Sequence, residues 1–167
     1  MGSFGPPATG QQKKGIGRER VLHHVSIRWS DVNAYAIVSD AALATYIEEA
    51  RGALIRRLAD LTTERHKAAP HLVYLTVRQR IDYLLPLRWQ EEPLVISLRV
   101  LRIRPSAAEL LARVGCDSAP CAEARVLSTC WNTARHRPHL LTSAQRALLA
   151  HYSDNTRSDD CIPGKLR

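Results

Sequence analysis

The spacing of apolar and polar residues changes along this chain, and each spacing predicts a different element. Side chains alternate over residues 21–29, with Val25, Ile27 and Trp29 on one face, and this pattern predicts a strand. From Asp40 onward the apolar residues recur at three- and four-residue steps, which predicts a long amphipathic helix. The apolar stripe of that helix consists of Leu43, Ile47, Ala50, Leu54 and Leu58.

Alternation returns after the helix. It predicts strands over 72–84, 94–104, 109–114 and 122–134, followed by a short helix over 144–152 that Thr142 or Ser143 caps. In the first of these strands it places Tyr74 and Arg78 on one face and Val77 and Ile81 on the other. Strands that follow a helix in a run are typical of an antiparallel α+β domain. We expect one sheet with a single long helix in its concave face, and open sheet edges that favour dimerisation.

Length and composition indicate one core domain with two arms. The 167 residues suit a single domain. Residues 1–19, which include basic residues, and residues 153–167 lack hydrophobic periodicity, so we expect both to be disordered and the domain to span 20–152. No apolar run is long enough to cross a membrane, and no N-terminal apolar segment resembles a secretion signal. We therefore expect a cytoplasmic protein without membrane contact.

The four cysteines show no metal-binding spacing, and no metal or cofactor is expected. Free thiols in a reducing cytosol are the simplest interpretation, although Cys116 and Cys121 flank a turn and could face each other across a hairpin. The net charge of +8 suggests an anionic partner such as a nucleotide, phosphopantetheine, an acidic carrier protein or a nucleic acid, unless it reflects composition alone. Aromatic residues make up only 5%, which argues against nucleic-acid binding because stacking platforms are scarce.

The segment between the first strand and the helix carries the candidate chemistry. It contains Asp31, Asn33 and Tyr35, and it ends at Ser39 and Asp40, either of which can cap the helix. Backbone N–H groups near Val38, Ser39 and Asp40, together with the helix dipole, would polarise a carbonyl group. Asp40 is either a plain cap or a base that activates water, and Asp31 is either a turn-fixing residue or the base. Asn33 could hold a water or the carbonyl oxygen, and Tyr35 either donates a hydrogen bond to the ligand or packs as an aromatic residue.

The same segment resembles the hotdog-fold acyl-CoA thioesterases of the 4-hydroxybenzoyl-CoA thioesterase type. The matching residues are Arg28-Trp29-Ser30-Asp31, Ala34-Tyr35, Val38, Tyr46-Ile47-Glu48-Glu49-Ala50-Arg51 and Asp82-Tyr83-Leu84-Leu85-Pro86-Leu87. The resemblance covers about residues 22–150 and implies a five-stranded antiparallel sheet wrapped around one long central helix. At the family's catalytic aspartate this chain has Asn33. The family's glycine, histidine and Asn-Asn pair fall on Ala36, Ile37 and Ser39-Asp40.

This resemblance implies hydrolysis of an acyl thioester, carried by CoA or by an acyl carrier protein, in a homo-oligomer (a homodimer or homotetramer). Water would attack the carbonyl with Asp40 or Asp31 as base and the helix amides as the oxyanion site. The alternative is a protein that does not hydrolyse, because an amide at Asn33 cannot act as a base near neutral pH. Such a protein would bind an acyl or polyketide-like ligand, or catalyse a lyase, cyclisation or isomerisation step.

Two further groups of charged residues fit this interpretation. Other hotdog branches carry a catalytic carboxylate on the central helix, where this chain has Glu48 and Glu49; Glu48 can instead simply pair with Arg51 three residues later. Arginines on the strands could hold the phosphates of CoA or form a solvated face, and these are Arg78, Arg80, Arg88, Arg99, Arg102 and Arg104.

Overall fold

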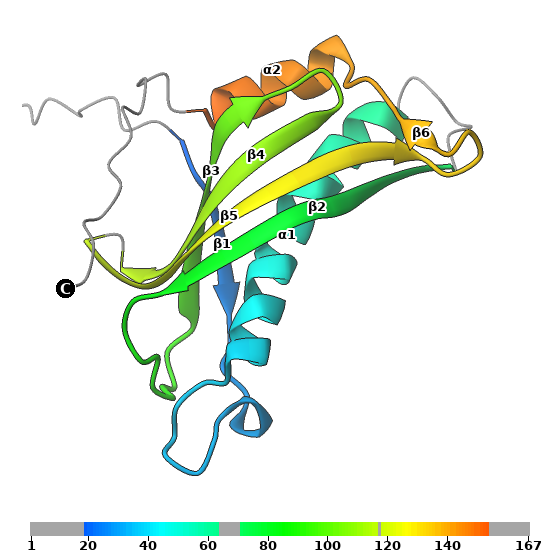
Figure 1. Cartoon of the computed structure of the whole chain (residues 1–167). Helices are drawn as coiled ribbons and strands as arrows, with labels where there is room; N and C mark the ends of the chain where they lie inside the picture. Colours follow the sequence, from blue (N-terminus) through cyan, green and yellow to red (C-terminus); the bar gives the residue numbers. More distant parts are fainter. Residues whose placement is uncertain (1–18, 64–70, 117, 154–167) are drawn as a thin grey trace, which may run out of the picture.

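The computed structural model describes residues 19–63, 71–116 and 118–153. Its elements follow the predicted order (Figure 1): β1 (Val21–Val25), a 3₁₀ turn η1 (Trp29–Asp31), α1 (Asp40–Thr63), β2 (Leu72–Tyr83), β3 (Leu94–Ile103), β4 (Ala107–Cys116), β5 (Ala119–Asn132), β6 (Arg137–Pro138) and α2 (Ser143–His151). Apart from Glu19 and Ser153, the two arms expected to be disordered lie outside the described residues.

The main sheet has the strand order β1-β3-β4-β5-β2, and every neighbouring pair is antiparallel. Figure 1 shows α1 lying along one face of this sheet, which confirms the expected hotdog architecture. All five residues of the predicted helical stripe are buried, and they pack with the inward side chains of the strands, such as Leu98, Val100 and Val126. The two-residue strand β6, which pairs with the end of β5, was not predicted because it is too short for a periodic signal.

The first strand is shorter than its alternation suggests. It ends at Val25, where its last partner Leu94 begins β3, so no neighbouring backbone remains to continue the ladder. The chain then turns, and Trp29 starts the 3₁₀ turn with its side chain 72% exposed. The prediction that Trp29 shares a strand face with Val25 is therefore wrong.

A bulge in β2 also corrects the predicted faces of that strand. The register with β5 shifts between Thr76 and Arg78, so Val77 has no partner. Before the shift Tyr74 lies opposite the buried Cys130, and after it Ile81 lies opposite the buried Ala124. Both Tyr74 and Ile81 pack against the core, although simple alternation places them on opposite faces.

The β4–β5 hairpin separates the two cysteines that flank it. Cys116 lies opposite Ala119, and a register shift follows, so Cys121 does not face Cys116 across the ladder. Cys116, Cys121 and Cys130 are free thiols. Burial raises the pKa of Cys121 and Cys130, whereas the hydroxyl of Ser118 lowers the pKa of the exposed Cys116.

Helix caps agree with the sequence. The Ser39 hydroxyl accepts a hydrogen bond from the Ala42 N–H at 3.2 Å, so Ser39 is the cap and Asp40 is the first helical residue. At α2, Thr142 and Gln145 bond each other reciprocally and form a capping box. Among the described helices, none is long and apolar enough to cross a membrane.

Candidate active site

The loop that precedes α1 is a small hairpin built on Asn33. Val32 bridges to Val38, and the Asn33 N–H donates to the Ile37 carbonyl at 2.8 Å. Three residues close the turn, and the last of them, Ala36, has a left-handed φ of 56°. Glycine adopts that conformation without strain, which gives a physical reason for the glycine that the resemblance expects at this position.

The Asn33 side chain holds this turn together. Its Oδ1 accepts hydrogen bonds from the backbone N–H groups of Tyr35 at 2.9 Å and Ile37 at 3.1 Å. Asparagine and aspartate favour this turn position because their side-chain oxygen can bond to the backbone just ahead. The carboxamide oxygen of Asn33 is therefore engaged by the loop itself.

A second segment fixes the other side of the hairpin. The Val38 N–H donates to the Leu87 carbonyl at 2.8 Å, and the Trp89 N–H donates to the Ala36 carbonyl at 2.9 Å. The rings of Trp29 and Trp89 meet edge to face, with their centroids 5.8 Å apart. The loop before α1 and the connection between β2 and β3 thus form one unit.

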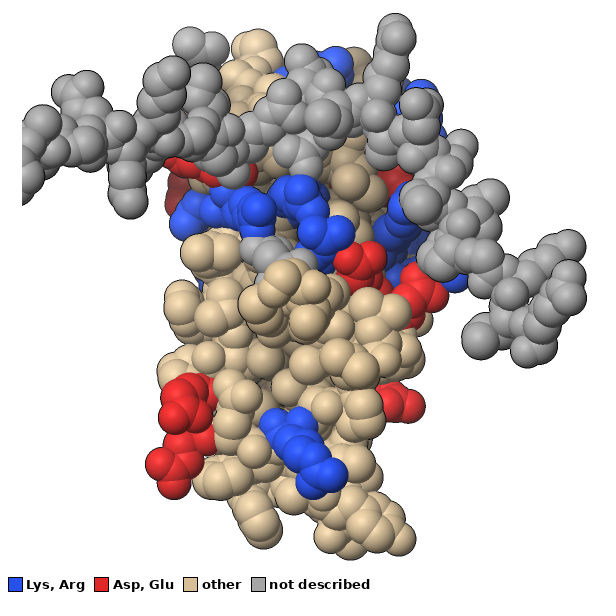
Figure 2. All heavy atoms as spheres, turned by 90° about the vertical axis from the view of Figure 1, so that its left-hand side faces the viewer, with Lys and Arg blue, Asp and Glu red and all other residues tan. Residues whose placement is uncertain are grey.

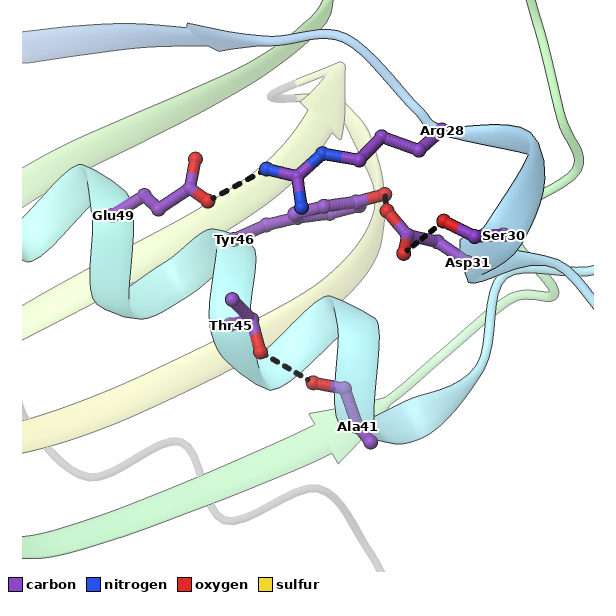
Figure 3. Close-up of polar contacts among 7 residues, drawn as sticks. All are labelled: Arg28, Ser30, Asp31, Ala41, Thr45, Tyr46 and Glu49. Carbon is purple, nitrogen blue, oxygen red and sulfur yellow. Dashed lines mark hydrogen bonds and ion pairs between the residues drawn. The ribbon is translucent and has the colours of Figure 1, made fainter.

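Asp31 links this loop to the helix. Its carboxylate accepts a hydrogen bond of 2.6 Å from the hydroxyl of Tyr46 on α1, as Figure 3 shows. That bond is the main reason why the pKa of Asp31 lies below its usual range. Burial and the neighbouring carboxylate raise the pKa of Tyr46 to about 12. Asp31 is thus ionised and Tyr46 neutral at neutral pH, which favours the structural interpretation of Asp31.

The backbone N–H groups at the start of α1 differ from those expected. Val38 donates to Leu87, and the Ser39 N–H donates to the Asp31 carbonyl at 2.9 Å, so neither is available to a ligand. Within the described part of the chain, the N–H groups of Asp40 and Ala41 have no acceptor. Of the three donors expected from the sequence only Asp40 stays open, and Ala41, one residue further into the helix, is open beside it.

The side chain of Asp40 stands beside these donors. It is exposed, and among residues 19–63, 71–116 and 118–153 its carboxylate has no hydrogen bond or ion pair. Asp31 is committed to Tyr46, so Asp40 is the carboxylate of this loop that remains free to act on a ligand. Tyr35 is 77% exposed, and the expectation of a packed aromatic residue does not hold within this chain.

The two glutamates in the middle of α1 have structural partners. Glu48 pairs with the buried Arg51, whose guanidinium also donates to the Ser128 hydroxyl of β5 at 3.2 Å. Glu49 reaches Arg28 at 3.5 Å, a contact drawn in Figure 3. Among the described residues no cluster of histidine, cysteine or carboxylate groups could hold a metal ion.

Chemically, the start of α1 combines the parts that acyl transfer needs. Two open N–H groups at the positive end of a 24-residue helix can stabilise a developing oxyanion, and an adjacent free carboxylate can accept a proton. The sequence indicated Asp40 and the helix start, but not which amides remain open. Backbone hydrogen bonds to Asp31 and Leu87 decide that.

Comparisons with known proteins agree with this fold. Solved structures with a similar fold include a hypothetical protein from Staphylococcus aureus in complex with CoA, at a TM-score of 0.71, 12% identity, and coverage of 90% of this chain and 96% of that one. A 1,4-dihydroxy-2-naphthoyl-CoA thioesterase from Synechocystis has a TM-score of 0.64 and 13% identity, and the match covers 79% of this chain and 96% of that one. A thioesterase from Thermus thermophilus, complexed with coenzyme A and Zn, has a TM-score of 0.60 and 22% identity, and the match covers 79% of this chain and 93% of that one.

No curated protein sequence matches the chain. The family model of the Thioesterase-like superfamily, in contrast, matches residues 27–149, which include the whole of the loop, α1 and the sheet from β2 to β5. Since this match spans well over half of the chain, the protein belongs to the Thioesterase-like superfamily and has the hotdog fold.

Proposed function

We propose that this protein hydrolyses an acyl thioester at the start of α1. The observation that carries the proposal is the pair of open N–H groups at Asp40 and Ala41 beside the unpaired Asp40 carboxylate. The thioester oxygen accepts hydrogen bonds from the two amides while Asp40 takes a proton from the attacking water. The C–S bond of the tetrahedral intermediate then breaks, and Asp40 returns the proton to the leaving thiolate, so that a carboxylic acid and a free thiol are released.

CoA or an acyl carrier protein supplies the thiol. Two structurally similar proteins are described in complex with CoA, and a third is named as a CoA thioesterase. The charge of this chain suits either carrier, since its net charge is +8. Figure 2 shows lysine and arginine side chains gathered in a band across one face, above a lower half that is mainly uncharged. Arg80 of β2 lies directly opposite Arg125 of β5, and Asp82 on the same strand pairs with Arg80 at 3.0 Å.

A thiol-release assay with a panel of short, long and aromatic acyl-CoA esters tests the proposal. Turnover of at least one ester by the purified, folded protein is the expected result. Absence of turnover across the panel, with CoA and with carrier-protein thioesters, would overturn it.

One observation favours a second candidate, a protein that binds or rearranges an acyl ligand without hydrolysis. By the sequence resemblance, Asn33 falls where the family has its catalytic aspartate, and both hydrogen bonds of its Oδ1 serve the turn. An amide there leaves no base at that position, which suits a lyase, cyclisation or isomerisation step that water would spoil.

An Asn33→Asp variant tests whether the site lacks only this base. Aspartate can accept the same two backbone hydrogen bonds, so we expect the free energy of unfolding to change by less than about 1 kcal/mol. If the rest of the site is competent, thiol release should rise about tenfold or more because a second carboxylate joins Asp40. Asn33→Ala is the matched control: it loses both bonds and should give no gain. A gain in both variants, or in neither, contradicts a site that lacks only this base.

One edge of β2 supports the oligomer that the resemblance implies. Among the described residues this 12-residue strand pairs only with β5, so its other edge is unpaired there, and Leu75 and Val77 on it are 44% and 60% exposed. A second copy pairing antiparallel along β2 would cover them. In one chain Trp29 and Tyr35 of the loop before α1 are also exposed.

A Val77→Lys variant tests this dimer. Lysine on an open strand edge opposes pairing, and here it would stand beside Arg78 in both copies. We expect sedimentation equilibrium to show a dimer for the unchanged protein and a dissociation constant raised about tenfold or more in the variant. Leu22→Lys, at a residue 54% exposed on the other edge strand, is the control and should remain dimeric. Equal weakening by both lysines would contradict pairing through β2.

A further inference from the structure

A hollow lies at the β5–β6 hairpin, apart from the candidate active site. Its volume is about 330 Å³, within the lower range of small-molecule sites, and its wall includes Arg135, Arg137 and His139. The remaining lining residues are Asn132, Pro138 and the exposed Leu140. Residues 132–140 contain two arginines and two histidines but no aspartate or glutamate. The wall of the hollow thus carries cationic groups and no carboxylate.

The side chains of Arg135 and Arg137 have no partner among the described residues. Neither guanidinium takes part in an ion pair or hydrogen bond there, in contrast to Arg80 and Arg113, which pair with Asp82 and Glu123. A cleft with charges of one sign concentrates the potential and attracts counter-ions. Two unpaired guanidinium groups on one short hairpin therefore favour an anion with several oxygen atoms.

The hairpin is held in one shape before any ligand arrives. The Asn132 Oδ1 accepts a hydrogen bond from the Arg135 N–H at 2.8 Å, and the His139 N–H donates to the Cys130 carbonyl at 2.9 Å. Asn132 also pairs with Arg137 across the ladder. These hydrogen bonds hold both sides of the hairpin and fix the spacing of the two arginine backbones. Binding of a ligand would therefore cost little conformational entropy.

The hollow and the start of α1 lie at opposite ends of the molecule. Figure 1 shows β6 at the upper right, whereas the loop before α1 hangs at the bottom. β5 ends at Asn132 in the wall of the hollow, and near its start the Cys121 carbonyl accepts hydrogen bonds from Leu84 and Leu85. With 14 residues, β5 spans on the order of 45 Å. The hollow therefore lies well away from the start of α1 within one chain.

From these observations we infer that the β5–β6 hairpin is a binding site for a phosphate-bearing ligand. Arg135 and Arg137 bind the phosphate oxygens, His139 lines the same wall, and Leu140 offers an apolar surface to the rest of the ligand. The ligand is either a free phosphorylated metabolite or the phosphorylated end of a CoA thioester held by another copy of the chain. The inference does not require the proposed hydrolysis.

Calorimetric titration with inorganic pyrophosphate at low salt tests the site. We expect saturable binding, weakened about tenfold by Arg135→Ala or Arg137→Ala and more by the double variant. Arg56→Ala, which removes an exposed arginine from α1, is the charge-matched control and should leave the affinity unchanged. Displacement of pyrophosphate by CoA would identify the thioester carrier as the source, and failure of CoA to compete would identify a separate metabolite; both outcomes retain the site.

Two results would overturn the inference. One is the absence of saturable binding to the folded, full-length protein. The other is an equal loss in all three single variants, which would show a general response to net charge. Because the readout is binding and not turnover, an inactive enzyme would leave this test intact, and an active enzyme without pyrophosphate binding would contradict the site alone.

Discussion

An Asp40→Asn variant is expected to lose about 100-fold or more in kcat while keeping its stability. A positioned proton acceptor contributes about 10²–10⁴-fold to a rate, and an amide cannot replace it. The side chain of Asp40 is exposed and has no partner among the described residues, and asparagine has nearly the same size, so the fold should not change. Thiol release under saturating acyl-CoA, measured beside thermal unfolding, checks both parts.

Asp31→Asn is the natural comparison, because Asp31 is the other carboxylate of the same loop. Its carboxylate accepts the 2.6 Å hydrogen bond from Tyr46, and an uncharged acceptor weakens such a bond. We expect this variant to lose about 1 kcal/mol of unfolding free energy while retaining most of its turnover. The opposite pattern, an active Asp40→Asn and an inactive Asp31→Asn, would transfer the role of base to Asp31.

The largest expected effect on stability comes from Glu48→Ala. Glu48 is the ion-pair partner of Arg51, whose side chain is only 7% exposed. Without the glutamate, the buried guanidinium keeps, among the residues that the structure describes, only the hydroxyl of Ser128 as partner. Breaking a buried ion pair on one side typically costs about 3–5 kcal/mol, and because Glu48 itself is half exposed we expect about 3 kcal/mol, measured by urea unfolding.

Two controls make this prediction specific. Glu49→Ala removes the neighbouring charge from the same helix, but its partner Arg28 is exposed and 3.5 Å away, so the loss should stay below about 1 kcal/mol. Adding Arg51→Met to Glu48→Ala removes the stranded charge and should restore part of the stability, since an apolar side chain tolerates the same surroundings. Equal losses for Glu48→Ala and Glu49→Ala would show that burial of Arg51 does not matter.

Local patterns were sufficient for most of the architecture. The helix begins at Asp40 as its spacing indicated, and each strand of the main sheet lies where alternation placed it, because each burial face repeats with the period of its own backbone. The departures occur where one residue breaks the period. The bulge at Val77 moves Tyr74 and Ile81 to the same face, and β1 stops at Val25 for want of a partner strand.

For the candidate site, the sequence identified the residues but not their roles. Its residues form one contiguous loop, so Asp31, Asn33 and Asp40 could be named from the chain alone. Their tasks could not, because each depends on a partner elsewhere in the fold or in the turn. Tyr46 engages Asp31, and the carbonyls of Leu87 and Asp31 occupy the amides of Val38 and Ser39. No sequence motif marks the cationic hollow at Arg135 and Arg137.

By itself, the order of residues determined where helix and strands form and which side chains face the core, since periodicity and capping act over a few neighbouring positions. Only the folded chain decided which donors and charges remain unpaired. The partners of a hydrogen-bonding group come from any part of the folded chain, so the sequence does not show which groups lack one. Among the described residues the structure leaves unpaired the amides of Asp40 and Ala41, the carboxylate beside them and the two arginines of the hollow.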